Sequence, residues 1–153
     1  MSMTDNKHFD ERQILARGRG FQIGFLTALA MTVLDLLSED FLFESSVGIN
    51  VYSRAMLCIW IPITVVSIYF ILNDAYEKIN ETGGRVLMGM FILVGLVEII
   101  VTIVRTVSGS DVFIENGIVG DALGQFCTGA AMLGIAAVYF VKQAINRNRF
   151  EEE

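Results

Sequence analysis

Four apolar stretches constrain the fold of this 153-residue chain more than any other feature. They cover residues 21–37, 55–72, 86–104 and 122–141. A helix needs about 20 predominantly apolar residues, with roughly 17 as the lower limit, to cross the hydrocarbon core of a bilayer, and each stretch is long enough. We therefore predict an all-α fold in which residues 1–153 form a single membrane domain, an integral four-helix bundle.

The composition agrees with a lipid environment. Hydrophobic residues make up 54% of the chain and charged residues 18%, whereas about 25% of the residues of a typical soluble domain are charged. The net charge of −6 comes from acids spread over termini and loops. No basic patch with interleaved aromatic residues is present, so nucleic-acid binding is not expected.

Positively charged residues lie mainly on one side of the predicted spans. With four spans, the N-terminal flank, the middle loop and the C-terminal tail share a side and hold nine of the eleven Lys and Arg residues. The nine are Lys7, Arg12, Arg17, Arg19, Lys78, Arg85, Lys142, Arg147 and Arg149. The other side holds Arg54 and Arg105. Because Lys and Arg are enriched in cytoplasmic flanks, both termini are predicted to be cytoplasmic.

The first span is preceded by the charged segment FDERQILARGRG, residues 9–20. Asp10 and Gln13 have the spacing of a capping box, with Asp in place of the usual Ser or Thr. A helix is therefore predicted to begin near Glu11 and to continue into the span, with its arginines among anionic lipid head groups. The alternative is a frayed polar tail, which would have the same effect on topology.

Small residues form a smooth face on two of the predicted spans. The first span carries Gly20 and Gly24, and the fourth carries Gly120, Gly124 and Gly134. Small residues let helix backbones approach closely in lipid. We therefore predict that the first and fourth helices pack through these glycines, or that the same faces join two subunits of a homo-oligomer.

Glu98 is an acid deep within a predicted span, about two thirds of the way along the third span. A charged residue at such depth costs from about 2.5 kcal/mol upward. Helical spacing places Arg105 on the same stripe, two turns nearer the outer surface. Other polar residues expected near that outer level complete a predicted polar cluster: Asp35, Arg54, Asp121 and Gln125.

This polar cluster has two interpretations. In the functional one, Glu98 binds a cation or a proton that reaches it from the outer side. In the structural one, Glu98 pairs with an arginine, or accepts a hydrogen bond from Thr102 or a neighbouring helix, and so fixes which helix faces pack. The sequence leaves both interpretations open.

Side chains suited to catalysis are scarce in the sequence. The only histidine, His8, precedes the first helix, and no metalloprotease, hydrolase or phosphate-binding motif is present. Cys58 and Cys127 are far apart and set among apolar residues, which is typical of packing residues. We expect no catalytic residue, no metal and no cofactor, and hence a protein that is not an enzyme.

The segment FDERQILARG, residues 9–18, is followed at once by an apolar span. This combination resembles a group of small uncharacterised four-span membrane proteins of Gram-positive bacteria with an N-terminal DERQ motif. The resemblance implies a bacterial cytoplasmic membrane and a companion role beside small helix-turn-helix regulators or transport operons. The small multidrug transporters also combine four short spans with an essential membrane glutamate, but theirs lies in the first span, whereas Glu98 lies in the third.

The function expected from these features is that of a small non-enzymatic membrane protein. It would be an accessory or regulatory partner of another membrane or cytoplasmic protein, which it meets through its charged cytoplasmic ends. The alternative is a small cation- or proton-coupled transporter or channel that uses Glu98.

Overall fold

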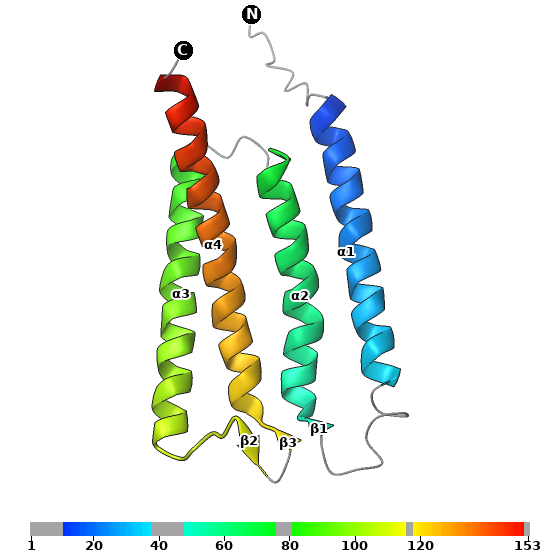
Figure 1. Ribbon diagram of the computed structural model, residues 1–153, viewed down its shortest axis with the longest axis vertical. Coiled ribbons are helices and arrows are strands. Elements are labelled where there is room, and N and C mark those ends of the chain that lie inside the picture. The colour runs from blue at the N-terminus through cyan, green and yellow to red at the C-terminus, as the bar shows by residue number, and fades with distance from the viewer. Residues whose placement is uncertain (1–10, 38–47, 76–80, 116–117, 152–153) are drawn as a thin grey trace, which may run out of the picture.

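The computed structural model describes residues 11–37, 48–75, 81–115 and 118–151, and long helices dominate it (Figure 1). The helices are α1 (Glu11–Leu37), α2 (Val51–Leu72), α3 (Glu81–Val107) and α4 (Asp121–Glu151). All four are long and apolar enough to cross a bilayer. The chain is therefore a multi-pass, all-α membrane protein with a bundle of four helices, as its apolar stretches predict.

The helices reach beyond the apolar stretches at several of their ends. α1 includes Glu11, near which the sequence predicts a helix start. Asp10, which would complete the capping box, lies outside the described residues, as do Lys7 and Lys78.

The four helices pack side by side in the order α1, α2, α4, α3 (Figure 1). Extensive contacts join α1 to α2, α2 to α4, and α4 to α3. Because α2 lies between α1 and α4, the predicted packing of the first helix on the fourth is wrong within one chain. The helices α1 and α3 form the two edges of the row, and each has one closely packed neighbour.

The two ends of the row differ in structure. We call the end where α1 begins and α4 ends the terminal end (Figure 1). The opposite end, the sheet end, carries three two-residue strands, β1 (Gly48–Ile49), β2 (Ile114–Glu115) and β3 (Ile118–Val119). Their order is β1-β3-β2, with β1 parallel and β2 antiparallel to β3. The small sheet thereby ties the start of α2 to the segment that leads into α4.

Glycines of α1 provide the contact with α2. A Cβ at Gly20 would overlap the ring of Phe70, and a Cβ at Gly24 would overlap Val66. Both α1 glycines singled out in the sequence therefore lie at a helix contact, but the contact is with α2.

The α2–α4 contact at the sheet end centres on Ser53, which is fully buried. Its hydroxyl donates a hydrogen bond to the Gly120 carbonyl (2.7 Å) and accepts one from the Gly124 amide (3.0 Å). A Cβ at Gly124 would lie 2.9 Å from Ser53 Cα. Ser53 thus bridges the Gly120 carbonyl and the Gly124 amide at the start of α4 and fixes the start of α2 against it.

The α3–α4 contact brings two main chains together. A Cβ at Gly129 would lie 2.8 Å from the Gly95 carbonyl oxygen, and a Cβ at Gly95 would lie 3.0 Å from the Gly129 carbonyl oxygen. By contrast, a Cβ at Gly134 would meet no atom within 4 Å. Gly134, which the sequence suggests as a packing residue, therefore lies outside these helix contacts.

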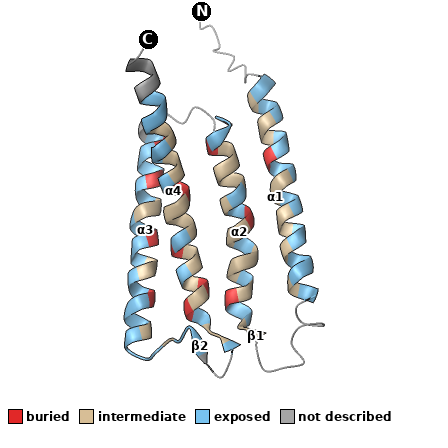
Figure 2. Ribbon diagram, in the orientation of Figure 1, coloured by how far each residue is buried: buried red, intermediate tan, exposed pale blue. Residues whose placement is uncertain are grey.

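Buried residues follow the lines between neighbouring helices (Figure 2). The core cluster consists of Ile71, Met88, Ile135 and Ala136. Large apolar side chains elsewhere on all four helices are exposed, including Phe25, Leu93 and Ile100. In a bilayer these side chains contact lipid tails, so close packing and hydrogen bonds, more than apolar burial, determine which helices associate.

Candidate functional site

The predicted polar cluster does not form one site in the structure. Asp35 and Arg54 lie between α1 and α2, where Arg54 Nε is 3.3 Å from Asp35 Oδ1. Glu98 and Gln125 lie on α3 and α4, and Thr102 links them. Asp121 is exposed in the first turn of α4.

Arg105 is engaged with the turn that follows α3. Its guanidinium Nη1 is 3.4 Å from Asp111 Oδ2. The amides of Ser110 and Asp111 donate to the Arg105 carbonyl at 2.9 and 3.3 Å, which folds the turn back over the end of the helix. Arg105, which shares a helical stripe with Glu98, is therefore not the arginine that pairs with it, because its guanidinium faces Asp111.

Thr102 is the centre of the polar contact between α3 and α4. It is fully buried, and its hydroxyl donates to the Glu98 main-chain carbonyl at 2.8 Å. The same hydroxyl oxygen lies 3.4 Å from Gln125 Oε1. A hydroxyl has one proton to donate, so the shorter contact to Glu98 takes it and the contact to Gln125 is weaker.

The Glu98 side chain leaves α3 beside α4. A Cβ at Gly129 would lie 3.3 Å from Glu98 Cβ, so the glycine makes room for it. Glu98 is partly buried. Among the described residues its carboxylate forms no ion pair and accepts no hydrogen bond, since the Thr102 hydroxyl contacts the main chain of Glu98 instead.

The geometry gives the α3–α4 contact an unused acceptor within a membrane-spanning segment. A carboxylate there is expensive unless it is protonated or meets a cation or a donor. Gln125 adds an amide at the same contact, about one helical turn from Gly129. We call Glu98, Thr102 and Gln125 the polar seam. It can take a proton, a cation or a hydrogen-bond donor.

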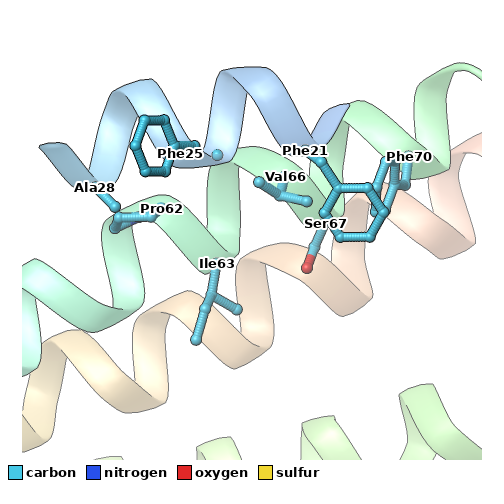
Figure 3. A pocket seen from close by; sticks show the side chains of 9 residues that line it. Phe21, Phe25, Ala28, Pro62, Ile63, Val66, Ser67 and Phe70 are labelled. Atoms are coloured by element: carbon cyan, nitrogen blue, oxygen red, sulfur yellow. The ribbon is translucent and has the colours of Figure 1, made fainter. Parts of the chain in front are cut away.

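A separate apolar groove lies between α1 and α2 (Figure 3). Its volume is about 630 Å³. Figure 3 shows the rings of Phe21 and Phe25 from α1 and of Phe70 from α2 at this groove. Its other lining residues are Gly24, Ala28, Pro62, Ile63, Val66 and Ser67. Glu98 does not line the groove, so the polar seam and the groove are distinct places.

Two cations at the terminal end were not singled out by the sequence as contacts of α2. Arg17 of α1 donates from Nε to the Ala75 carbonyl (2.8 Å), and Lys142 of α4 donates to the Leu72 carbonyl (2.9 Å) and to Asp74 (2.6 Å). The last carbonyls of a helix lack intrahelical donors and attract cations, which is the signal that could have found Lys142. Arg17 contacts the turn after α2, for which the sequence gives no such signal.

The described part of the chain brings no group of three His, Cys, Asp or Glu side chains together in a way that could hold a metal ion. Comparison with protein-family models, curated proteins and solved structures finds no match. The row of helices and the polar seam are therefore the features from which a function can be inferred.

Proposed function

We propose that this chain is a small non-enzymatic membrane protein that acts as an accessory or regulatory partner of another protein in a bacterial cytoplasmic membrane. The observation that carries the proposal is the open row. Its edge helices α1 and α3 each pack closely on one neighbour, and the polar seam holds a carboxylate that no described side chain neutralises. Such a surface is suited to association with a further helix.

The proposed topology places both termini in the cytoplasm. Cations of the described residues gather at the terminal end: Arg12, Arg17, Arg19, Arg85, Lys142 and Arg147. The sheet end carries Arg54 and Arg105. This asymmetry favours a cytoplasmic terminal end. Single cysteines at Arg147 and Ser108, in a chain without Cys58 and Cys127, would test it by labelling intact cells. Labelling at Ser108 alone is expected, and labelling at Arg147 alone would reverse the orientation.

The partner role is tested by photo-crosslinking in native membranes. A crosslinking amino acid is placed in turn at exposed α3 positions, such as Leu93, Val97 and Ile100, and at exposed α1 positions, such as Leu26 and Leu29. We expect adducts of one defined size whose yield varies with the helical period along one edge. Adducts with lipid alone at every position would contradict a partner role.

The second candidate function is cation- or proton-coupled transport through Glu98. The observation that favours it is that Arg54 and Arg105 contact Asp35 and Asp111, so neither neutralises Glu98. Purified protein in liposomes would be assayed for ion-dependent flux beside Glu98→Gln. Transport requires a flux that the substitution abolishes, and equal flux in both proteins would exclude Glu98 as its site.

A further inference from the structure

We propose that the polar seam binds a basic side chain, with arginine the best match, carried at the same membrane depth by a transmembrane helix of a different protein. The proposal rests on the proposed function, because it names the chemistry of the partner. It begins with Glu98, whose carboxylate has neither an ion pair nor a hydrogen bond among the described residues.

The two arginines expected nearest to the membrane depth of Glu98 interact with other acids. Arg54 pairs with Asp35 across α1 and α2. Arg105 faces Asp111 in the turn after α3. An intramembrane acid is normally paired with another polar group. Because the described residues supply none for the Glu98 carboxylate, we look for its partner on another protein.

Gln125 gives the site a second acceptor. Its Oε1 is 3.4 Å from the Thr102 hydroxyl, which donates its proton to the Glu98 carbonyl at 2.8 Å. The amide oxygen of Gln125 therefore keeps acceptor capacity about one helical turn from Gly129, the residue that Glu98 lies against. A guanidinium presents several donors in one plane and fits such a set of acceptors better than an ammonium does.

The approach to Glu98 is open along α3. Val94 and Val101 lie about one turn before and after Glu98, on the same helical stripe, and are 38% and 39% exposed. Both are apolar and compatible with a neighbouring helix in lipid. A helix lying along this stripe would cover Glu98 and bring its own side chains to the polar seam.

A second copy of this chain carries no cation inside its spans. Residues 21–37, 55–72, 86–104 and 122–141 contain no Lys or Arg. All eleven Lys and Arg residues lie at or beyond the ends of these spans. Charge complementarity therefore selects a different protein, one with a basic residue inside a span.

A synthetic transmembrane peptide tests the proposal directly. The probe is a Leu-Ala host helix with one arginine placed at the depth of Glu98, and the matched control has leucine at that position. Binding to the full-length protein in liposomes is measured by energy transfer between fluorophores. We expect the arginine peptide to bind about tenfold more tightly than the leucine peptide, since polar contacts between model helices in membranes are of that size.

Two variants locate the effect. Glu98→Gln is expected to abolish the preference for arginine, and circular dichroism checks that its helices are retained. The double variant Val97→Glu with Glu98→Gln keeps the carboxylate at nearly the same depth but moves it from the contact with α4 at Gly129 to an exposed position of α3. It is expected to bind the arginine peptide less tightly than the wild type does. Gln125→Leu, which keeps Glu98, is expected to reduce the preference only in part.

Three results would overturn the proposal: equal binding of both peptides to the wild type, an undiminished preference in Glu98→Gln, or full preference in the displaced-glutamate variant. Glu98-dependent capture of a labelled second copy as tight as capture of the peptide would also overturn it, in favour of two carboxyl groups sharing a proton. The proposed function fails separately. If crosslinked adducts form in cells but do not depend on Glu98, the partner role stands and the proposed site is wrong. If the arginine peptide binds but no adducts form in cells, the site stands and the partner role is wrong.

Discussion

The two outer contacts of the row, α1 on α2 and α3 on α4, use glycine in opposite ways. On α1, Gly20 leaves space for the ring of Phe70, a side chain that can rotate. Between α3 and α4, Gly95 and Gly129 each lie against the other's main-chain carbonyl. Glycine thus makes room for a side chain in the α1–α2 contact and for the main chain of the neighbouring helix in the α3–α4 contact. Whether the atom opposite the glycine can move decides how large a side chain could replace it.

Polar groups also occupy different levels in the two contacts. The α1–α2 contact has its polar groups towards its ends, where Arg17 binds the Ala75 carbonyl and Asp35 meets Arg54. The apolar groove lies along this contact, at Phe21 and Phe25 of α1 (Figure 3). The α3–α4 contact instead has the polar seam next to its backbone crossing. Polar groups therefore stabilise the α1–α2 contact near its ends and the α3–α4 contact beside its backbone crossing.

Gly129→Leu should have the largest effect. The side chain would meet the Gly95 carbonyl and Ile99, and main chain cannot move aside without separating the helices. We expect a loss of about 3 kcal/mol in the free energy of unfolding, the upper part of the range for overpacking. Unfolding in mixed micelles with increasing SDS, followed by circular dichroism, measures it. An effect no larger than that of Gly20→Leu would remove the distinction between the two contacts.

Gly20→Leu should cost less, about 1 kcal/mol, because the Phe70 ring can rotate away. Adding Phe70→Ala tests this explanation, because it empties the space that the new side chain needs. The double variant should be more stable than the sum of the two single losses predicts. Strict additivity would show that Gly20 and Phe70 do not act on each other.

Arg17→Met should cost about 0.5–1 kcal/mol, since it removes a charged donor from a partly buried carbonyl but keeps the apolar stem of the side chain. The same micelle assay measures the loss. The matched control is Arg19→Met, because Arg19 is exposed on the same helix. Equal losses for both variants would indicate a general charge effect instead of the contact with Ala75.

Gly134→Ala should have the smallest effect, within about 0.5 kcal/mol of the parent protein. No atom lies within 4 Å of the added Cβ, and alanine favours the helix slightly. A large loss of stability in the same assay would contradict the conclusion that Gly134 lies outside the helix contacts.

The spans could be predicted from the sequence because lipid acts on each helix separately. A stretch such as residues 86–104 must be apolar along its whole length, wherever its neighbours lie. The stripe that joins Glu98 to Thr102 was also predictable, since helical spacing alone puts these residues one turn apart. Both features are local to one segment.

The order of the helices could not be predicted in the same way. Lipid offers little apolar driving force between helices, so small local fits decide the neighbours, such as the Ser53 hydroxyl between Gly120 and Gly124. The partner of Arg105 depends on how the turn to Asp111 folds back. The two-residue strands are too short to produce any periodic pattern, and β1 pairs with a segment about seventy residues later.

The order α1, α2, α4, α3 has a consequence for biosynthesis. The helix made last, α4, takes the place between α2 and α3. While the ribosome is still adding it, the hairpin of α1 and α2 and the lone α3 have no extensive contact to hold them together in the bilayer. The row can therefore close only after the last span has entered the bilayer, and a chain cut short before α4 would leave α3 without its packing partner.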